Sequence, residues 1–137
     1  MKFTKPHFIA SVSSEAQKQK KLLISKYGDF DENDSDIFIV LGGDGFMLQA
    51  IKDYMDKKVP FFGINYGSIG FLMNAVSTDD LLTRLEKTQS VQLSPLIMTA
   101  YDQDDMFHTA KAINEVSLLR QKQQAAKLKV FIDDQVR

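Results

Sequence analysis

A short run of glycines encloses a single carboxylate in the stretch GGDG, residues 42–45. Because Asp44 is the only residue of this run with a side chain beyond hydrogen, a sugar or a phosphate can lie directly against its carboxylate. Such a carboxylate can accept a proton from an attacking hydroxyl, or hold a metal ion beside a transferring phosphoryl group. The alternative is that Asp44 only caps a following helix, since Asp is a favoured N-cap residue. Capping alone would not require Gly42, Gly43 and Gly45, so we favour the chemical role.

A second cluster of glycines, Gly63, Gly67 and Gly70, also follows an apolar run. In an open parallel sheet, ligands bind at the loops that leave the carboxyl ends of the strands. Glycine in such loops lets backbone N–H groups approach a ligand closely. Neither cluster has the spacing of a P-loop or of the dinucleotide fingerprint G-x-G-x-x-G. The two clusters therefore predict a site for a ribose or a phosphate at one edge of a sheet.

The elements that position these clusters alternate between apolar runs and helical patterns. The run IFIVL is apolar at every position, which is typical of a parallel strand covered on both faces. Alternation of strands and helices predicts an α/β fold with a parallel, Rossmann-like sheet. The predicted strands cover residues 7–12, 37–41 and 59–64, and the predicted helices follow the candidate caps Ser13 and Ser14, start at Phe46, and start at Ser77.

The pattern changes after about residue 88, where short strand-like runs alternate with polar turns and no helix is evident. We therefore predict an α/β domain over residues 1–88 and the beginning of an all-β second domain over residues 89–137. The sequence stops at Arg137, just after a strand-like run, so the second domain is expected to be truncated.

Composition limits the partners that the chain is expected to have. The 17 basic and 18 acidic residues give a net charge of −1, so no basic field attracts nucleic acid or a membrane surface. There is no cysteine, and neither histidine has a second one at ligand spacing, so we predict no protein metal site. No apolar run is long enough for a signal peptide or a membrane span, and a cytoplasmic location is expected.

Three motifs together resemble those of the NAD kinase family. GGDG after an apolar strand is shared by NAD kinases, lipid kinases and phosphofructokinases. The stretch FFGINYGSIGFLMN (61–74) is similar to the G-I-N-x-G-x-L-G-F-L stretch of NAD kinases, and AINEVSLLR (112–120) is similar to their Asn-Glu motif inside a strand. The motifs occur in the order and at the usual spacing of the family, and the resemblance covers essentially the whole chain. Phe46 replaces the threonine that usually follows GGDG.

The resemblance implies transfer of a phosphoryl group from ATP or polyphosphate to the 2′-hydroxyl of the adenosine ribose of NAD, giving NADP. It also implies Mg²⁺ or another divalent cation, and a homo-oligomer, either a dimer or a tetramer. By similarity Asp44 is the proton acceptor of the reaction. The implied NAD contacts are Asp44, Gly45, Phe71, Asn114 and Glu115, and the implied phosphate loop contains Gly42, Gly43 and Gly67.

Two alternatives stay open at this point. GGDG alone is also compatible with a lipid kinase of the diacylglycerol or sphingosine type. In addition, the second domain of NAD kinases carries a further G-D-G turn and a T-P-T-G-S-T-A-Y segment, and residues 89–137 contain neither. The second alternative is therefore that the chain is a truncated, catalytically silent nucleotide-binding module.

Overall fold

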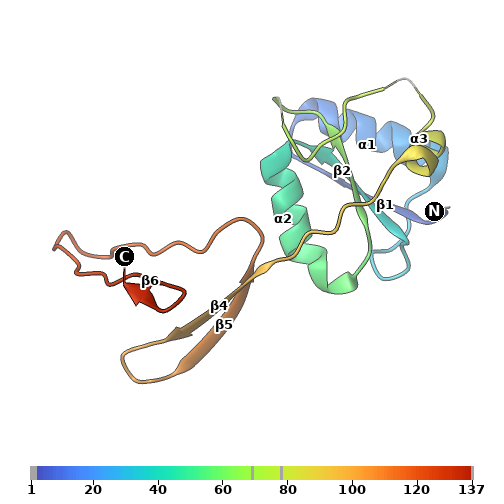
Figure 1. Cartoon of the computed structure of the whole chain (residues 1–137). Helices are drawn as coiled ribbons and strands as arrows, with labels where there is room; N and C mark the ends of the chain where they lie inside the picture. The colour runs from blue at the N-terminus through green and yellow to red at the C-terminus, as the bar shows by residue number, and fades with distance from the viewer. Residues whose placement is uncertain (1–2, 69, 78, 137) are drawn as a thin grey trace.

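The computed structural model describes residues 3–68, 70–77 and 79–136, and it holds a three-stranded parallel sheet with helices on both faces (Figure 1). The strands lie in the order β1-β2-β3. They are β1 (Pro6–Ala10), β2 (Ile37–Gly42) and β3 (Phe61–Asn65). The helices are α1 (Ser14–Tyr27), α2 (Asp44–Tyr54) with a short 3-10 extension η1 (Met55–Lys57), and α3 (Leu81–Lys87). This arrangement confirms the predicted α/β class with a parallel sheet.

The central strand β2 is buried along its whole length, as its apolar sequence predicts. Alternate side chains of a strand point to opposite faces, so β2 supplies both layers of the core. Ile37, Ile39 and Leu41 pack with residues of α1 and α3. Val40 packs on the opposite face with Met47 and Ala50 of α2. The sheet therefore holds α2, and with it the GGDG turn, in a fixed place at the end of β2.

Several boundaries differ from those that the sequence predicts. β1 ends at Ala10 rather than at residue 12, and the Val12 side chain is fully exposed. β3 begins at Phe61, two residues later than expected, and α2 begins at Asp44, two residues earlier. Helix α1 is capped by Ser13, whose Oγ accepts a hydrogen bond from the N–H of Ala16 at 3.3 Å.

The predicted helix start at Ser77 is wrong, because α3 begins at Leu81 with Asp80 as its N-cap. The Asp80 carboxylate accepts hydrogen bonds from the N–H groups of Leu82 and Thr83 at 3.1 and 3.4 Å. It also accepts from Lys26 Nζ at 2.7 Å and from the Tyr27 hydroxyl at 2.6 Å. We call this contact between the end of α1 and the start of α3 the Asp80 clasp. The hydrogen bonds from Lys26 and Tyr27 lower the pKa of Asp80 to about 2.

The remainder of the chain is strand-rich, as predicted. Strands β4 (Leu96–Tyr101) and β5 (Phe107–Ala112) form an antiparallel hairpin, and β6 (Phe131–Ile132) pairs with β7 (Gln135–Val136). The hairpin extends away from the parallel sheet in Figure 1, and its side chains are mostly exposed. An ion pair at 2.9 Å between Lys111 Nζ and Asp56 Oδ1 links β5 to η1. The division into domains at residue 88 stays a prediction, and Arg137 lies outside the described residues.

Candidate functional site

The GGDG turn, which we call the first glycine loop (42–45), joins the end of β2 to the start of α2. Gly43 is the N-cap of α2, with φ −111° and ψ −178°, and no side chain caps this helix end. The carbonyl oxygen of Gly43 accepts hydrogen bonds from the N–H groups of Phe46 and Met47. The half-buried side chain of Asp44 is thus not a helix cap, and the capping alternative is wrong.

The Asp44 carboxylate binds the backbone of the loop that follows β3, the second glycine loop (66–68 and 70–72). Asp44 Oδ2 accepts a hydrogen bond from the N–H of Phe71 at 2.7 Å. Asp44 Oδ1 accepts one from the N–H of Leu72 at 3.1 Å. Because each oxygen has its own donor, the plane of the carboxylate is held in one orientation.

The two glycine loops also meet through their backbones. A Cβ atom built on Gly67 would lie 3.2 Å from Gly43 Cα, which is closer than most side chains allow. The N–H of Tyr66 donates to the Gly42 carbonyl oxygen at 2.8 Å. The Asn65 side chain shapes the second loop, since its Oδ1 accepts from the N–H of Gly67 at 2.9 Å. The two glycine clusters therefore lie side by side at the carboxyl edge of the parallel sheet.

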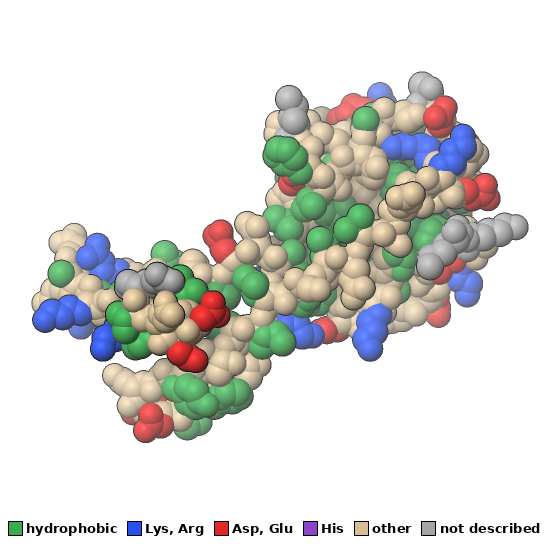
Figure 2. All heavy atoms as spheres, in the orientation of Figure 1, with side chains coloured by type: hydrophobic (Ala, Val, Ile, Leu, Met, Phe, Trp, Pro, Cys, Tyr) green, Lys and Arg blue, Asp and Glu red, His purple; other side chains and the backbone are tan. Residues whose placement is uncertain are grey.

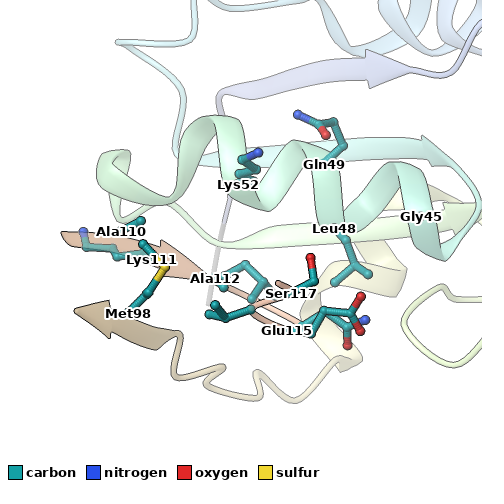
Figure 3. A pocket seen from close by; sticks show the side chains of 13 residues that line it. Gly45, Leu48, Gln49, Lys52, Met98, Ala110, Lys111, Ala112, Glu115 and Ser117 are labelled. Carbon is teal, nitrogen blue, oxygen red and sulfur yellow. The ribbon is translucent and has the colours of Figure 1, made fainter. Parts of the chain in front are cut away.

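A pocket of about 450 Å³ opens between α2 and the residues around the end of β5 (Figure 3). Its wall brings Gly45 of the first glycine loop together with Asn114 and Glu115 of the third motif. Leu48 points from α2 toward the segment that carries Glu115 (Figure 3). The remaining lining residues are Gln49, Lys52, Met98, Ala110, Lys111, Ala112, Ile113, Val116 and Ser117.

The structure gathers the predicted site residues in two adjoining places. Gly45, Asn114 and Glu115 line the pocket, whereas Gly42, Gly43, Asp44 and Gly67 belong to the paired glycine loops beside it. The Phe71 side chain is 99% exposed and does not line this pocket, although its backbone N–H binds Asp44. The role of each of these residues in binding NAD stays a prediction.

The secondary structure predicted for the Asn-Glu motif is wrong. β5 ends at Ala112, so Asn114 and Glu115 follow the strand instead of lying inside it. Because Asn114 and Glu115 lie beyond the end of β5, their backbone is not paired with β4. The segment instead runs beside α2, where the pocket forms.

Sequence reasoning missed the residues of α2 that line the pocket. Leu48, Gln49 and Lys52 follow Gly45 at intervals of three, four and seven residues, which places all four on one face of a helix. That spacing was the available signal. Lys52 adds a cationic group to the wall of the pocket, and Lys111 adds a second one that is paired with Asp56.

Within the described residues, no group of three His, Cys, Asp or Glu side chains lies close enough to hold a metal ion. The acidic groups of the site are separate carboxylates, so the residues present do not fit a metal cage built by the protein alone. Among the helices of the described ranges, none combines the length and apolar character that crossing a bilayer requires.

Comparison with known proteins indicates the same family as the three sequence motifs. The family model of the ATP-NAD kinase N-terminal domain matches residues 1–90. The chain is 43% identical to the NAD kinase of Caulobacter vibrioides over 134 residues, which are 98% of this chain and 52% of that relative. It is 45% identical to the NAD kinase of Rhizobium meliloti over 136 residues, covering 99% of this chain and 53% of the relative.

A third relative gives the same picture. The NAD kinase of Hyphomonas neptunium is 45% identical over 130 residues, covering 95% of this chain and 51% of the relative. The chain thus spans about half the length of the curated relatives that it matches. Because the family model covers most of the chain and these identities extend over nearly all of it, the chain belongs to the NAD kinase family.

Proposed function

We propose that the intact protein phosphorylates the 2′-hydroxyl of the adenosine ribose of NAD with ATP or polyphosphate, giving NADP. The observation that carries this proposal is the meeting of the three motifs around the start of α2. The first glycine loop contacts the second through Asp44 and Gly43, and Gly45 shares a pocket with Asn114 and Glu115. Family membership supports the same reaction.

In the proposed reaction the 2′-hydroxyl oxygen attacks the terminal phosphorus of ATP. A new oxygen–phosphorus bond forms, the bond from that phosphorus to the bridging oxygen breaks, and ADP leaves. The hydroxyl proton passes to the Asp44 carboxylate, which acts as the general base. Each Asp44 oxygen accepts one backbone N–H and keeps a further lone pair for this proton.

The other predicted residues are assigned to binding. A Cβ atom built on Gly45 would meet no heavy atom within 4 Å, so the backbone there is open to a ligand. Asn114 offers amide donors and an acceptor to ribose or adenine edges, and Glu115 accepts hydroxyl protons. Gly42, Gly43 and Gly67 keep the loops close to the phosphates, and Phe71 offers an exposed ring to NAD.

We assign the divalent cation to the phosphoryl donor. Mg²⁺ usually keeps several waters and binds through one or two carboxylates together with substrate phosphates. This mode agrees with separate carboxylates better than with a protein cage. When bound, the ion neutralises charge on the transferring phosphoryl group, and no step of the proposed reaction depends on a protein-held metal.

The test is NADP formation from NAD and ATP by the 137-residue chain and by a version extended with a complete second domain. Activity in the extended version establishes the proposed reaction, and activity in that version alone marks the shorter chain as an incomplete enzyme. Phosphorylation of a diacylglycerol but not of NAD would establish the lipid kinase alternative. No phosphorylation by either version would leave a silent nucleotide-binding module.

A cytoplasmic location and a homo-oligomeric state belong to the same proposal. The location is expected from the apolar pattern of the sequence, and the oligomer is implied by the family resemblance. Light scattering of the extended version tests the oligomer. A mass equal to a single chain at micromolar concentration would contradict it.

A further inference from the structure

Gly70 determines how much space the Asp44 carboxylate has. A Cβ atom built on Gly70 would lie 2.7 Å from the Asp44 Cγ atom and would also overlap the carboxylate oxygens. No real Cβ contact is that short, so a side chain at position 70 and the observed position of the Asp44 carboxylate exclude each other. The carboxylate itself occupies the space that a methyl group on Gly70 would need.

The same carboxylate receives the two backbone N–H groups that come directly after Gly70. Phe71 donates to Oδ2 at 2.7 Å and Leu72 donates to Oδ1 at 3.1 Å. The carboxylate lies against the Gly70 Cα because these two donors hold it there. A side chain at Gly70 would therefore either push the carboxylate off both donors or displace the loop that carries them.

We propose that Gly70 is a positioning residue for phosphoryl transfer, because its bare Cα lets the Phe71 and Leu72 N–H groups orient the Asp44 carboxylate toward the ribose hydroxyl. This inference rests on the proposed function. In this role Gly70 acts through the Asp44 carboxylate rather than through a contact of its own with the substrate. A misplacement of about 1 Å at a reacting group can cost about 100-fold in rate, which is the scale expected when this support is lost.

The first test measures the contact without any catalysis. Hydrogen exchange of the Phe71 and Leu72 amides is followed by NMR in the 137-residue chain and in its Gly70→Ala and Asp44→Asn variants. Hydrogen bonds to a charged acceptor are among the stronger ones, so both variants should lose about 10-fold or more of the protection at these amides. Full protection in Gly70→Ala, or none in the unmodified chain, overturns the proposal.

The matched control adds one methyl group elsewhere in the same loop. Ser68 is exposed, and its carbonyl oxygen rather than its hydroxyl binds Asn65. Ser68→Thr should therefore keep the protection of the Phe71 and Leu72 amides. If Ser68→Thr loses this protection to the same degree as Gly70→Ala, any bulk in this loop is harmful and the specific contact with Asp44 is overturned.

The second test uses the form of the enzyme that makes NADP. Gly70→Ala should lower kcat by about 10- to 100-fold while KM for NAD changes by less than about threefold, because the proton acceptor is misplaced but the pocket is intact. An unchanged kcat, or a rise in KM alone, overturns the positioning role. If no form makes NADP while the exchange pattern is as expected, the proposed function has failed and the contact is structural only.

Discussion

The Asp44 carboxylate is the residue on which the proposed chemistry depends. Its two oxygens accept backbone N–H groups from a loop that lies far away in the sequence, and its neighbours on both sides are glycines. Because the carboxylate is already held in one orientation, it needs little reorganisation to accept the proton of a ribose hydroxyl.

We expect Asp44→Asn to lower NADP formation by about 100- to 10,000-fold, because an amide cannot take the hydroxyl proton. Asp44 contributes no side chain to the buried core, so circular dichroism of the variant should match that of the unmodified chain. Steady-state kinetics of the active form checks the prediction. Asp34→Asn makes the same chemical change at an exposed position and serves as the control. Normal turnover by Asp44→Asn would remove Asp44 from the chemistry.

For single residues, the sequence predicts which of them lie together at the candidate site better than it predicts where their side chains point. The spacing of glycines around Asp44 indicates a site because glycine has a distinctive effect on backbone approach. The partners of Asp44 are backbone N–H groups. Every residue except proline has such a group, so residue type does not identify these partners in the sequence. For the same reason the importance of the space at Gly70 emerges only from coordinates.

The secondary structure elements around the site owe their stability to β2. Ile39 lies in the middle of this strand with its side chain fully buried between β2 and the helices of one face. We expect Ile39→Ala to lower the free energy of unfolding by about 2–5 kcal/mol, since it leaves a cavity in the core. Urea unfolding checks the value. Leu22→Ala, on the exposed side of α1, should change it by about 0.5 kcal/mol or less. Equal effects of the two changes would contradict the assigned core.

The Asp80 clasp should make the docking of α3 on α1 depend on pH. The pKa of Asp80 is about 2 in the folded chain against an ordinary value of 3.8, so the carboxylate is charged and stabilising at neutral pH. Its contribution is present above pH 3.8 and is lost as the pH falls toward 2. Thermal melts should therefore show Asp80→Asn below the unmodified chain at pH 7, and the difference should disappear near pH 2.

Asp80→Asn keeps an N-cap of similar quality, so the comparison isolates the contact with Lys26 and Tyr27. A difference in melting temperature that stays constant across the pH range would contradict the assignment. The clasp also explains why the start of α3 was not predicted. Ser77 and Asp80 are both good capping residues, and the tertiary contact with α1 decides between them.

Other elements were predictable because a local pattern determines them. Five consecutive apolar residues predict a strand buried on both faces, and Gly28 ends α1 with φ 76°, a conformation that favours glycine. The Asn114–Glu115 segment had no such pattern. It lies across a pocket from α2, so its surroundings involve residues distant in the sequence.

Viewed as a whole, the molecule exposes more surface than its mass requires. Its accessible surface is 10765 Å², whereas a compact monomer of 15.5 kDa exposes about 7,200 Å². Figure 2 shows hydrophobic side chains at the surface of the strand-rich part. Ile97, Leu118 and Leu119 are 76%, 85% and 89% exposed. The α/β part has a conventional core, so the excess of about 3,500 Å² comes chiefly from residues after α3.

We expect the 137-residue chain to associate as its concentration rises, because exposed apolar surface of this extent promotes burial between molecules. The double variant Leu118→Ser, Leu119→Ser should lower the mass measured by light scattering at a given concentration. Val12→Ser, at a fully exposed position of the α/β part, should leave that mass unchanged. A mass independent of concentration in the unmodified chain would contradict the prediction.

The order of the elements along the chain has a consequence for biosynthesis. Every strand of the parallel sheet and every helix packed on it lies before residue 88. A ribosome therefore releases this scaffold first, and the nascent polypeptide can fix the Asp44 carboxylate before Asn114 and Glu115 have left the ribosome. The base of the proposed reaction and the ligand contacts of its pocket are thus assembled at different moments in the life of the protein.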